Sequence, residues 1–132
     1  MKKIINCFIF LFLFQISVLA QIYKYRTTLV AIKNGGEKWG EWHDSDALLV
    51  MDLDDKQRLT IYSKMVQKYD IIEMSKKYSD KDGDTNFNFS CVDQDGVSCF
   101  VTHCFCESQK GKEQIYIRYN NVTWAYYLRR LD

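Results

Sequence analysis

Five cysteines carry most of the chemistry available to this 132-residue chain. Cys7 lies in an apolar N-terminal run, whereas Cys91, Cys99, Cys104 and Cys106 gather in the C-terminal part. Thiols form disulfides, hold soft metal ions or take part in redox exchange, and the compartment decides which of these states persists. The even number outside the N-terminal run is compatible with two disulfides.

The spacing around Gly96 predicts how the first two of these cysteines meet. Residues 94–96 form a three-residue hairpin loop in which the third position favours a left-handed conformation, and glycine adopts it without a Cβ penalty. This register sets Cys91 opposite Cys99 and predicts a disulfide between them. A two-residue turn would instead oppose Cys91 and Phe100. The three-residue register predicts a core face made of Phe87, Phe89, Cys91, Val97, Cys99, Val101 and Phe105.

Cys104 and Cys106 fall on the opposite, polar face of the same hairpin, in a Cys-x-Cys spacing. A second disulfide, two free thiols, and a redox-active or metal-binding pair are all open for them. A bridge across one residue is strained and therefore easily reduced. A zinc site needs three or four ligands, and His103 points to the other face, which counts against zinc.

The segment around Trp39, Trp42 and His43 is the exposed binding candidate. Two indoles on a loop with Gly40 and acidic neighbours can stack on a sugar or clasp an apolar side chain. The alternative is that one or both tryptophans fold inward and plug an open barrel end. His43 beside Asp44 could be an oriented base, but no nucleophile signature accompanies it, so we predict no catalytic residues.

Asp80, Asp82 and Asp84 with Gly83 resemble part of a calcium loop. In an EF-hand the glycine comes sixth and a glutamate twelfth, whereas here glycine is fourth and Cys91 is twelfth. We therefore predict a solvated turn, with no metal and no cofactor.

The first twenty residues have the layout of a secretory signal peptide. Lys2 and Lys3 precede an apolar run from Ile4 to Phe14, and Ala20 provides a small residue for cleavage. The run is too short for a stable membrane span. We expect a signal helix over residues 1–20, a single β domain over 21–132, and export to the periplasm, the cell surface or the medium.

Charge limits the partners of the exported part. Removing Lys2 and Lys3 from 18 basic residues leaves 16, against 17 acidic residues. Without a basic stripe, nucleic-acid binding has little electrostatic support. A protein partner or a small molecule remains.

Turn signals recur about every ten residues, and the stretches between them are rich in β-branched and aromatic residues. Residues 65–72 also fit helical spacing, although their composition favours a strand. The pattern predicts an all-β fold, an antiparallel meander of about seven or eight strands closing as a small barrel or a sandwich. The predicted strands are 22–33, 47–53, 57–63, 86–93, 97–106, 113–119 and 123–131, with a further strand near 69–78.

These motifs together resemble small exported proteins of Bacteroidetes-type bacteria that have no assigned function. The resemblance rests on the Trp-x-x-Trp of Trp39 and Trp42 and on Cys-Val-Asp-x-Asp-Gly-x-x-Cys from Cys91 to Cys99. It also includes residues 46–53, 61–63, 69–72 and 80–84. It supports a strand over 69–78 and implies neither an activity nor catalytic residues.

Three functional hypotheses follow from the sequence. The first is a non-enzymatic exported β domain that binds a partner or small ligand through Trp39, Trp42 and His43. The second is a thiol-redox protein or enzyme that uses Cys104 and Cys106. The third is a structural or inhibitory module that docks by an exposed sheet edge.

Overall fold

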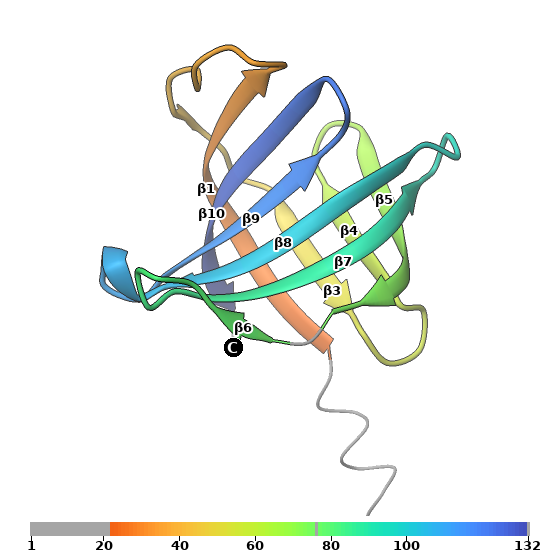
Figure 1. Ribbon diagram of the computed structural model, residues 1–132. Helices are drawn as coiled ribbons and strands as arrows, with labels where there is room; N and C mark the ends of the chain where they lie inside the picture. The colour runs from red at the N-terminus through yellow and green to blue at the C-terminus, as the bar shows by residue number, and fades with distance from the viewer. Residues whose placement is uncertain (1–21, 76, 132) are drawn as a thin grey trace, which may run out of the picture.

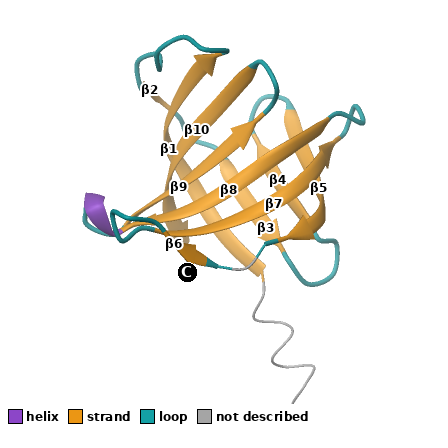
Figure 2. Ribbon diagram, viewed as in Figure 1, coloured by secondary structure: helices purple, strands orange, loops and turns teal. Residues whose placement is uncertain are grey.

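A computed structural model of the chain describes residues 22–75 and 77–131. The predicted signal peptide and its helix, residues 1–20, lie outside the described residues. Within the described part, nearly all regular structure is β-strand, interrupted by one short 3₁₀ turn (Figure 2). The elements in chain order are β1 (Ile22–Asn34), β2 (His43–Asp44), β3 (Leu48–Asp52), β4 (Arg58–Tyr62), β5 (Val66–Met74), β6 (Tyr78–Ser79), β7 (Thr85–Asp93), β8 (Ser98–Cys106), η2 (Glu107–Gln109), β9 (Lys112–Arg118) and β10 (Val122–Leu131).

The strands form one antiparallel meander that closes into an eight-stranded barrel (Figure 1). Around the barrel the order is β1, β3, β4, β5, β7, β8, β9 and β10, and β10 pairs with β1 to complete the ring. The two short strands lie outside the ring, β2 beside β1 and β6 beside β7. The all-β antiparallel prediction is therefore confirmed, and the architecture is a barrel. Closure leaves the described sheet no long free edge.

Alternating side chains of the eight strands fill the barrel. Leu49, Ile61, Ile115 and Ile117 have no or almost no exposed surface, and each contributes about 1.5–3 kcal/mol by burial. Their period of two is the pattern that the β-rich stretches predicted. The buried core consists of Tyr25, Ala47, Leu49, Met51, Leu59, Ile61, Tyr69, Ile71, Phe89, Cys91, Cys99, Val101, Ile115, Ile117 and Tyr126.

The ambiguous stretch after residue 65 is a strand, as its composition favoured. In β5 a register shift between Ile71 and Glu73 interrupts the pairing with β7. Ile71 is buried, whereas Ile72 at the irregularity is exposed. This bulge explains why two adjacent isoleucines do not both fit a strict alternation. The two-residue strands β2 and β6 were not predicted, because two residues carry no periodicity.

The hairpin of β7 and β8 has the predicted three-residue loop. Gly96 has a φ of 81°, and the Asp93 backbone N–H donates to the Val97 carbonyl at 2.9 Å. This register sets Cys91 opposite Cys99, as predicted. The placement of Val97 on the core face was wrong, since it is 48% exposed. Val97 belongs to the hairpin tip, which extends beyond the last buried layer of the barrel.

Both ends of the described chain reach the same end of the barrel. Lys24 near the start of β1 pairs with Leu131 at the end of β10, and the C-terminal label lies beside β6 in Figure 1. The turn between β3 and β4 and the segment between β5 and β6 also lie there. We call this end the barrel mouth.

Candidate functional site

A cavity of about 550 Å³ opens at the barrel mouth. Its size lies in the range of small-molecule sites, and its walls are mainly aromatic and aliphatic. Of the described residues that line it, Lys77 and Arg130 carry a charged group, and both are cationic. We call this space the mouth cavity. Its apolar wall is formed by Tyr23, Tyr25, Met51, Leu53, Met74, Phe87, Phe89 and Phe105.

A chain of three polar side chains, His103, Glu113 and Arg130, lies inside the barrel next to this cavity. His103 Nε2 is 2.9 Å from one carboxylate oxygen of Glu113, and Arg130 Nη2 is 3.1 Å from the other. The side chains of His103 and Glu113 are 6% and 13% exposed, whereas that of Arg130 is 51% exposed. Arg130 therefore connects a buried carboxylate to the cavity opening.

The carboxyl of Glu113 is held in its charged form. Burial alone would raise its pKa, but the hydrogen bond and charge of His103, then Arg130 and Tyr25, outweigh burial and lower the pKa below its usual range. A buried carboxylate with two such partners is electrostatically satisfied. The Glu113 carboxylate, which is also bound to His103, can therefore hold the Arg130 guanidinium in place.

Tyr25 completes the polar end of the mouth cavity. Its side chain is fully buried, and its ring lies edge-on to His103 at a centroid distance of 5.5 Å. Among the described residues, no atom meets hydrogen-bond geometry with its hydroxyl, although Glu113 and Arg130 lie close enough to act on its pKa. Burial first, and the charge of Glu113 second, raise the pKa of Tyr25 to about 12, so the hydroxyl stays neutral and able to donate.

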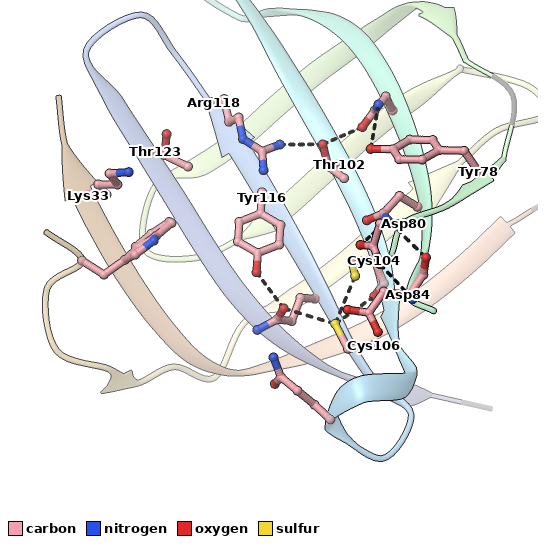
Figure 3. Close-up of a pocket in the computed structure, with 15 residues that line it drawn as sticks. Lys33, Tyr78, Asp80, Asp84, Thr102, Cys104, Cys106, Tyr116, Arg118 and Thr123 are labelled. Atoms are coloured by element: carbon pink, nitrogen blue, oxygen red, sulfur yellow. Dashed lines mark hydrogen bonds between the residues drawn. The ribbon is translucent and has the colours of Figure 1, made fainter. Parts of the chain in front are cut away.

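A second hollow, of about 600 Å³, lies on the outer surface of the barrel over β7 to β10. Its lining is mostly polar, and Figure 3 shows the two ends of it. Asp80, Asp84, Cys104 and Cys106 gather at one end, with Lys33 at the other. We call this surface the outer groove.

Cys104 and Cys106 point together into the outer groove, as alternate residues of one strand do. Their sulfurs are 3.1 Å apart, and the side chains are almost completely buried. The Cys106 thiol also donates to Gln114 Oε1 at 3.2 Å. With one ligand atom of Asp84, the two sulfurs form a group in which all three atoms lie within 4.8 Å of one another.

The turn before β7 positions Asp84. Asp80 Oδ1 accepts from the backbone N–H groups of Asp82 and Asp84 at 2.9 and 3.1 Å, which closes the turn. The Asp84 carboxylate accepts from the backbone N–H and the hydroxyl of Ser108, both at 2.9 Å. The acidic turn is therefore held by its own hydrogen bonds, as a structural turn would be, and it directs Asp84 toward the thiols.

The electrostatics of the groove do not favour a reactive thiolate. Burial is the largest cause that raises the pKa of both Cys104 and Cys106, and the charges of Asp84 and Asp80 raise both further. Redox cysteines usually have a lowered pKa and lie near cationic groups. The thiol-redox hypothesis thus receives no support from these surroundings.

Cys91 and Cys99 lie in the barrel interior as free, buried thiols. Burial, followed by the charge of Cys99, raises the pKa of Cys91 to about 12. No two sulfurs of the described cysteines are at bonding distance, so the structure contains the predicted register without the predicted bridge. The disulfide remains a prediction.

The three residues of the predicted binding loop lie on the outside of the barrel, and each has different neighbours. Trp39 packs edge-on to Tyr116 at a centroid distance of 6.2 Å and lines the outer groove. Trp42 packs against Tyr127 at 4.6 Å. His43 is exposed in β2, where it pairs with Val30. Neither tryptophan plugs the mouth cavity.

Gly40 fixes this loop to the sheet. Its N–H donates to the Ile32 carbonyl at 2.9 Å, and a Cβ at this position would come within 3.1 Å of the same oxygen. Thr27 ties the far end of the loop through its hydroxyl, which contacts Ser45 Oγ and accepts from the Ala47 N–H. The loop is therefore a fixed part of the barrel surface.

Sequence reasoning missed the mouth cavity. His103, Glu113 and Arg130 come from three different strands, and only strand register brings them together. One signal was present: His103 falls on the predicted core face of the hairpin, where a buried polar group needs a partner.

Comparisons of the chain with protein-family models, curated proteins and solved structures gave no significant match. Over residues 22–75 and 77–131, the structure contains no helix with the length and apolarity needed to cross a membrane.

Proposed function

We propose that this protein is a non-enzymatic binding protein whose mouth cavity holds a small molecule with an apolar body and an anionic head. The observation that carries the proposal is the cavity itself, which has apolar walls and, among the described residues, only cationic charges at its border. A closed eight-stranded barrel can hold one small ligand where side chains leave part of its interior open, as they do at this mouth. The apolar walls suit an aliphatic chain, and the opening suits a carboxylate.

Arg130 is the residue proposed to bind the head group. Its guanidinium lies 5.9 Å from the ring centroids of both Tyr25 and Phe105, at the rim of the cavity. Glu113 occupies only one edge of the guanidinium fork, which has five N–H donors. Donors that do not face Glu113 can form a charge-assisted pair with a ligand carboxylate.

Decanoate titration by isothermal calorimetry tests this proposal, with decanol as the uncharged comparison. We expect saturable decanoate binding that Arg130→Gln weakens about 10–100-fold, since a hydrogen bond to a charged group contributes about 1.5–3 kcal/mol. Arg129→Gln is the matched control, because Arg129 is the exposed neighbour on the other face of β10. Leu53→Trp, which fills the cavity, should abolish binding of both ligands.

Two results would refute the assignment. Absence of saturable binding for both ligands would remove the cavity as a binding site. Equal effects of Arg130→Gln and Arg129→Gln would show that the head group is bound elsewhere. Circular dichroism of each variant verifies that the barrel is folded.

We also propose that the chain is exported, on the strength of its first twenty residues and the resemblance described above. In an oxidising compartment, Cys91 and Cys99 are expected to form the predicted disulfide. Intact-mass measurement on protein from the producing cells tests both points: the mature chain should lack residues 1–20 and the mass of two hydrogens. A full-length chain or an unoxidised pair would overturn the respective point.

A further inference from the structure

We propose that Cys104, Cys106 and Asp84 form a binding site for a thiophilic divalent cation of the zinc class on the outer face of the barrel. This site is separate from the mouth cavity, because even-numbered side chains of β8 point outward and odd-numbered ones inward. The proposal does not depend on ligand binding inside the barrel.

The donor set matches this class of cation. Two sulfurs and a carboxylate oxygen lie within 4.8 Å of one another, and all three side chains are buried. Zinc is bound by cysteine sulfur and by carboxylate oxygen, whereas calcium and magnesium require oxygen ligands throughout. Three protein ligands leave one position of a tetrahedron open to water or to Gln114, whose Oε1 lies 3.2 Å from the Cys106 sulfur.

The geometry needs only a small adjustment. Zn–S bonds of about 2.3 Å in a tetrahedron place two sulfurs about 3.8 Å apart. The observed separation is 3.1 Å, and rotation about the Cα–Cβ bonds of Cys104 and Cys106 can supply the difference. A disulfide would instead require the sulfurs to close to about 2.05 Å.

The partners around the donors are already arranged. Ser108 holds both oxygens of Asp84, and the Tyr116 hydroxyl donates to Gln114 Oε1 at 2.7 Å. Hydrogen bonds of this kind orient metal ligands and are usual around zinc. They also explain why a carboxylate is buried on an outer surface.

The cationic side chains of the groove are engaged elsewhere. Lys33, which lines the groove, lies over the ring of Trp39 at 6.0 Å. Arg118 donates to the Thr102 hydroxyl at 2.6 Å. The end of the groove that holds Asp80, Asp84 and the two thiols therefore concentrates acidic groups and lone pairs, which a bound cation would neutralise (Figure 3).

The test is a titration of the reduced, metal-free protein with zinc chloride, followed by cobalt chloride as a spectroscopic probe. We expect one zinc per chain and, with cobalt, the thiolate-to-metal charge-transfer absorption of a tetrahedral site. Cys104→Ser and Cys106→Ser should each weaken zinc binding more than about 100-fold, since changes in outer partners alone cost about 10–100-fold. Ser108→Ala should weaken it about 10-fold.

Matched controls separate the site from general effects. Asp84→Asn should weaken binding, whereas Asp82→Asn, an exposed carboxylate of the same turn, should not. Cys99→Ser, in the barrel interior, should leave the zinc stoichiometry unchanged.

Three outcomes would overturn the proposal. The folded, reduced protein takes up no zinc; the Cys104→Ser/Cys106→Ser double variant binds zinc as the parent does; or protein isolated from the producing cells without reductant carries a Cys104–Cys106 disulfide in place of a metal. Intact-mass spectrometry under native and denaturing conditions distinguishes the last outcome.

Discussion

Strand β8 presents two different chemistries on its two faces. Inward, His103 is paired with Glu113, which Arg130 also binds, so the buried charges are compensated by protein groups. Outward, Cys104 and Cys106 lie near carboxylates, and no protein cation pairs with them among the described contacts. The charges on the inner face are compensated, whereas the carboxylate and the sulfurs on the outer face have no cationic partner among the described contacts.

The two faces are stabilised by different interactions. The inner face packs in a closed core, so each of its buried apolar side chains should contribute about 1.5–3 kcal/mol to folding. The outer face is held by hydrogen bonds of a surface turn and by aromatic contacts, which contribute about 0.5–1.5 kcal/mol each. Substitutions on the two faces should therefore separate folding from binding.

The largest expected effect is on the inner face. Ile117→Ala should lower the free energy of unfolding by about 2–5 kcal/mol, because a fully buried side chain leaves a cavity in a closed barrel. Phe100→Ala is the outer control: Phe100 is 60% exposed, and its loss should change stability by less than about 0.5 kcal/mol. Urea denaturation measures both, and similar losses would contradict the assignment of the faces.

The second effect concerns the compensated pair. Glu113→Ala should cost about 2–3 kcal/mol, less than the 3–5 kcal/mol typical of a fully buried pair, because Arg130 is half exposed and screened by solvent. Glu107→Ala, an exposed glutamate in η2, is the control and should be nearly neutral. Equal urea midpoints for the parent and Glu113→Ala would show that the pair contributes nothing.

The third effect is a pH dependence. Since the folded pKa of Glu113 lies below its unfolded value of about 4.3, its contribution is present above that pH and is lost as pH falls through the folded pKa. In Glu113→Gln this part of the acid destabilisation should disappear. Urea midpoints measured from neutral to acid pH test this, and curves that stay parallel below pH 4 would contradict it.

Much of the fold could be predicted because barrel strands obey local rules. The alternation in β4 and the Gly96 loop each follow from a few neighbouring residues. The face of Cys104 and Cys106 followed from the same alternation. Closure of the ring could not be predicted, because it depends on pairing between β1 and β10, about a hundred residues apart in sequence.

The candidate sites show the same difference between local and long-range information. The thiol pair lies on one strand, and its spacing identified it. His103, Glu113 and Arg130 become neighbours only through the registers of β8, β9 and β10, and Asp84 reaches the thiols only through a surface turn. The Trp39 and Trp42 loop shows what spacing leaves open: composition placed two indoles on one loop, and the fold packs them against separate tyrosines. Its role in binding stays a prediction.

The smallest expected effect tests whether this loop or the mouth cavity binds the ligand. Trp42→Ala removes a ring packed on Tyr127 and should cost about 0.5–1.5 kcal/mol of stability. Because Trp42 does not line the mouth cavity, decanoate affinity should not change. Calorimetric titration of Trp42→Ala beside Arg130→Gln makes the comparison direct. If Trp42→Ala loses as much decanoate affinity as Arg130→Gln, the loop and not the mouth cavity binds the ligand. The two side chains lie on different surfaces, and a loss of about 1 kcal/mol in stability would not reproduce such a change in affinity.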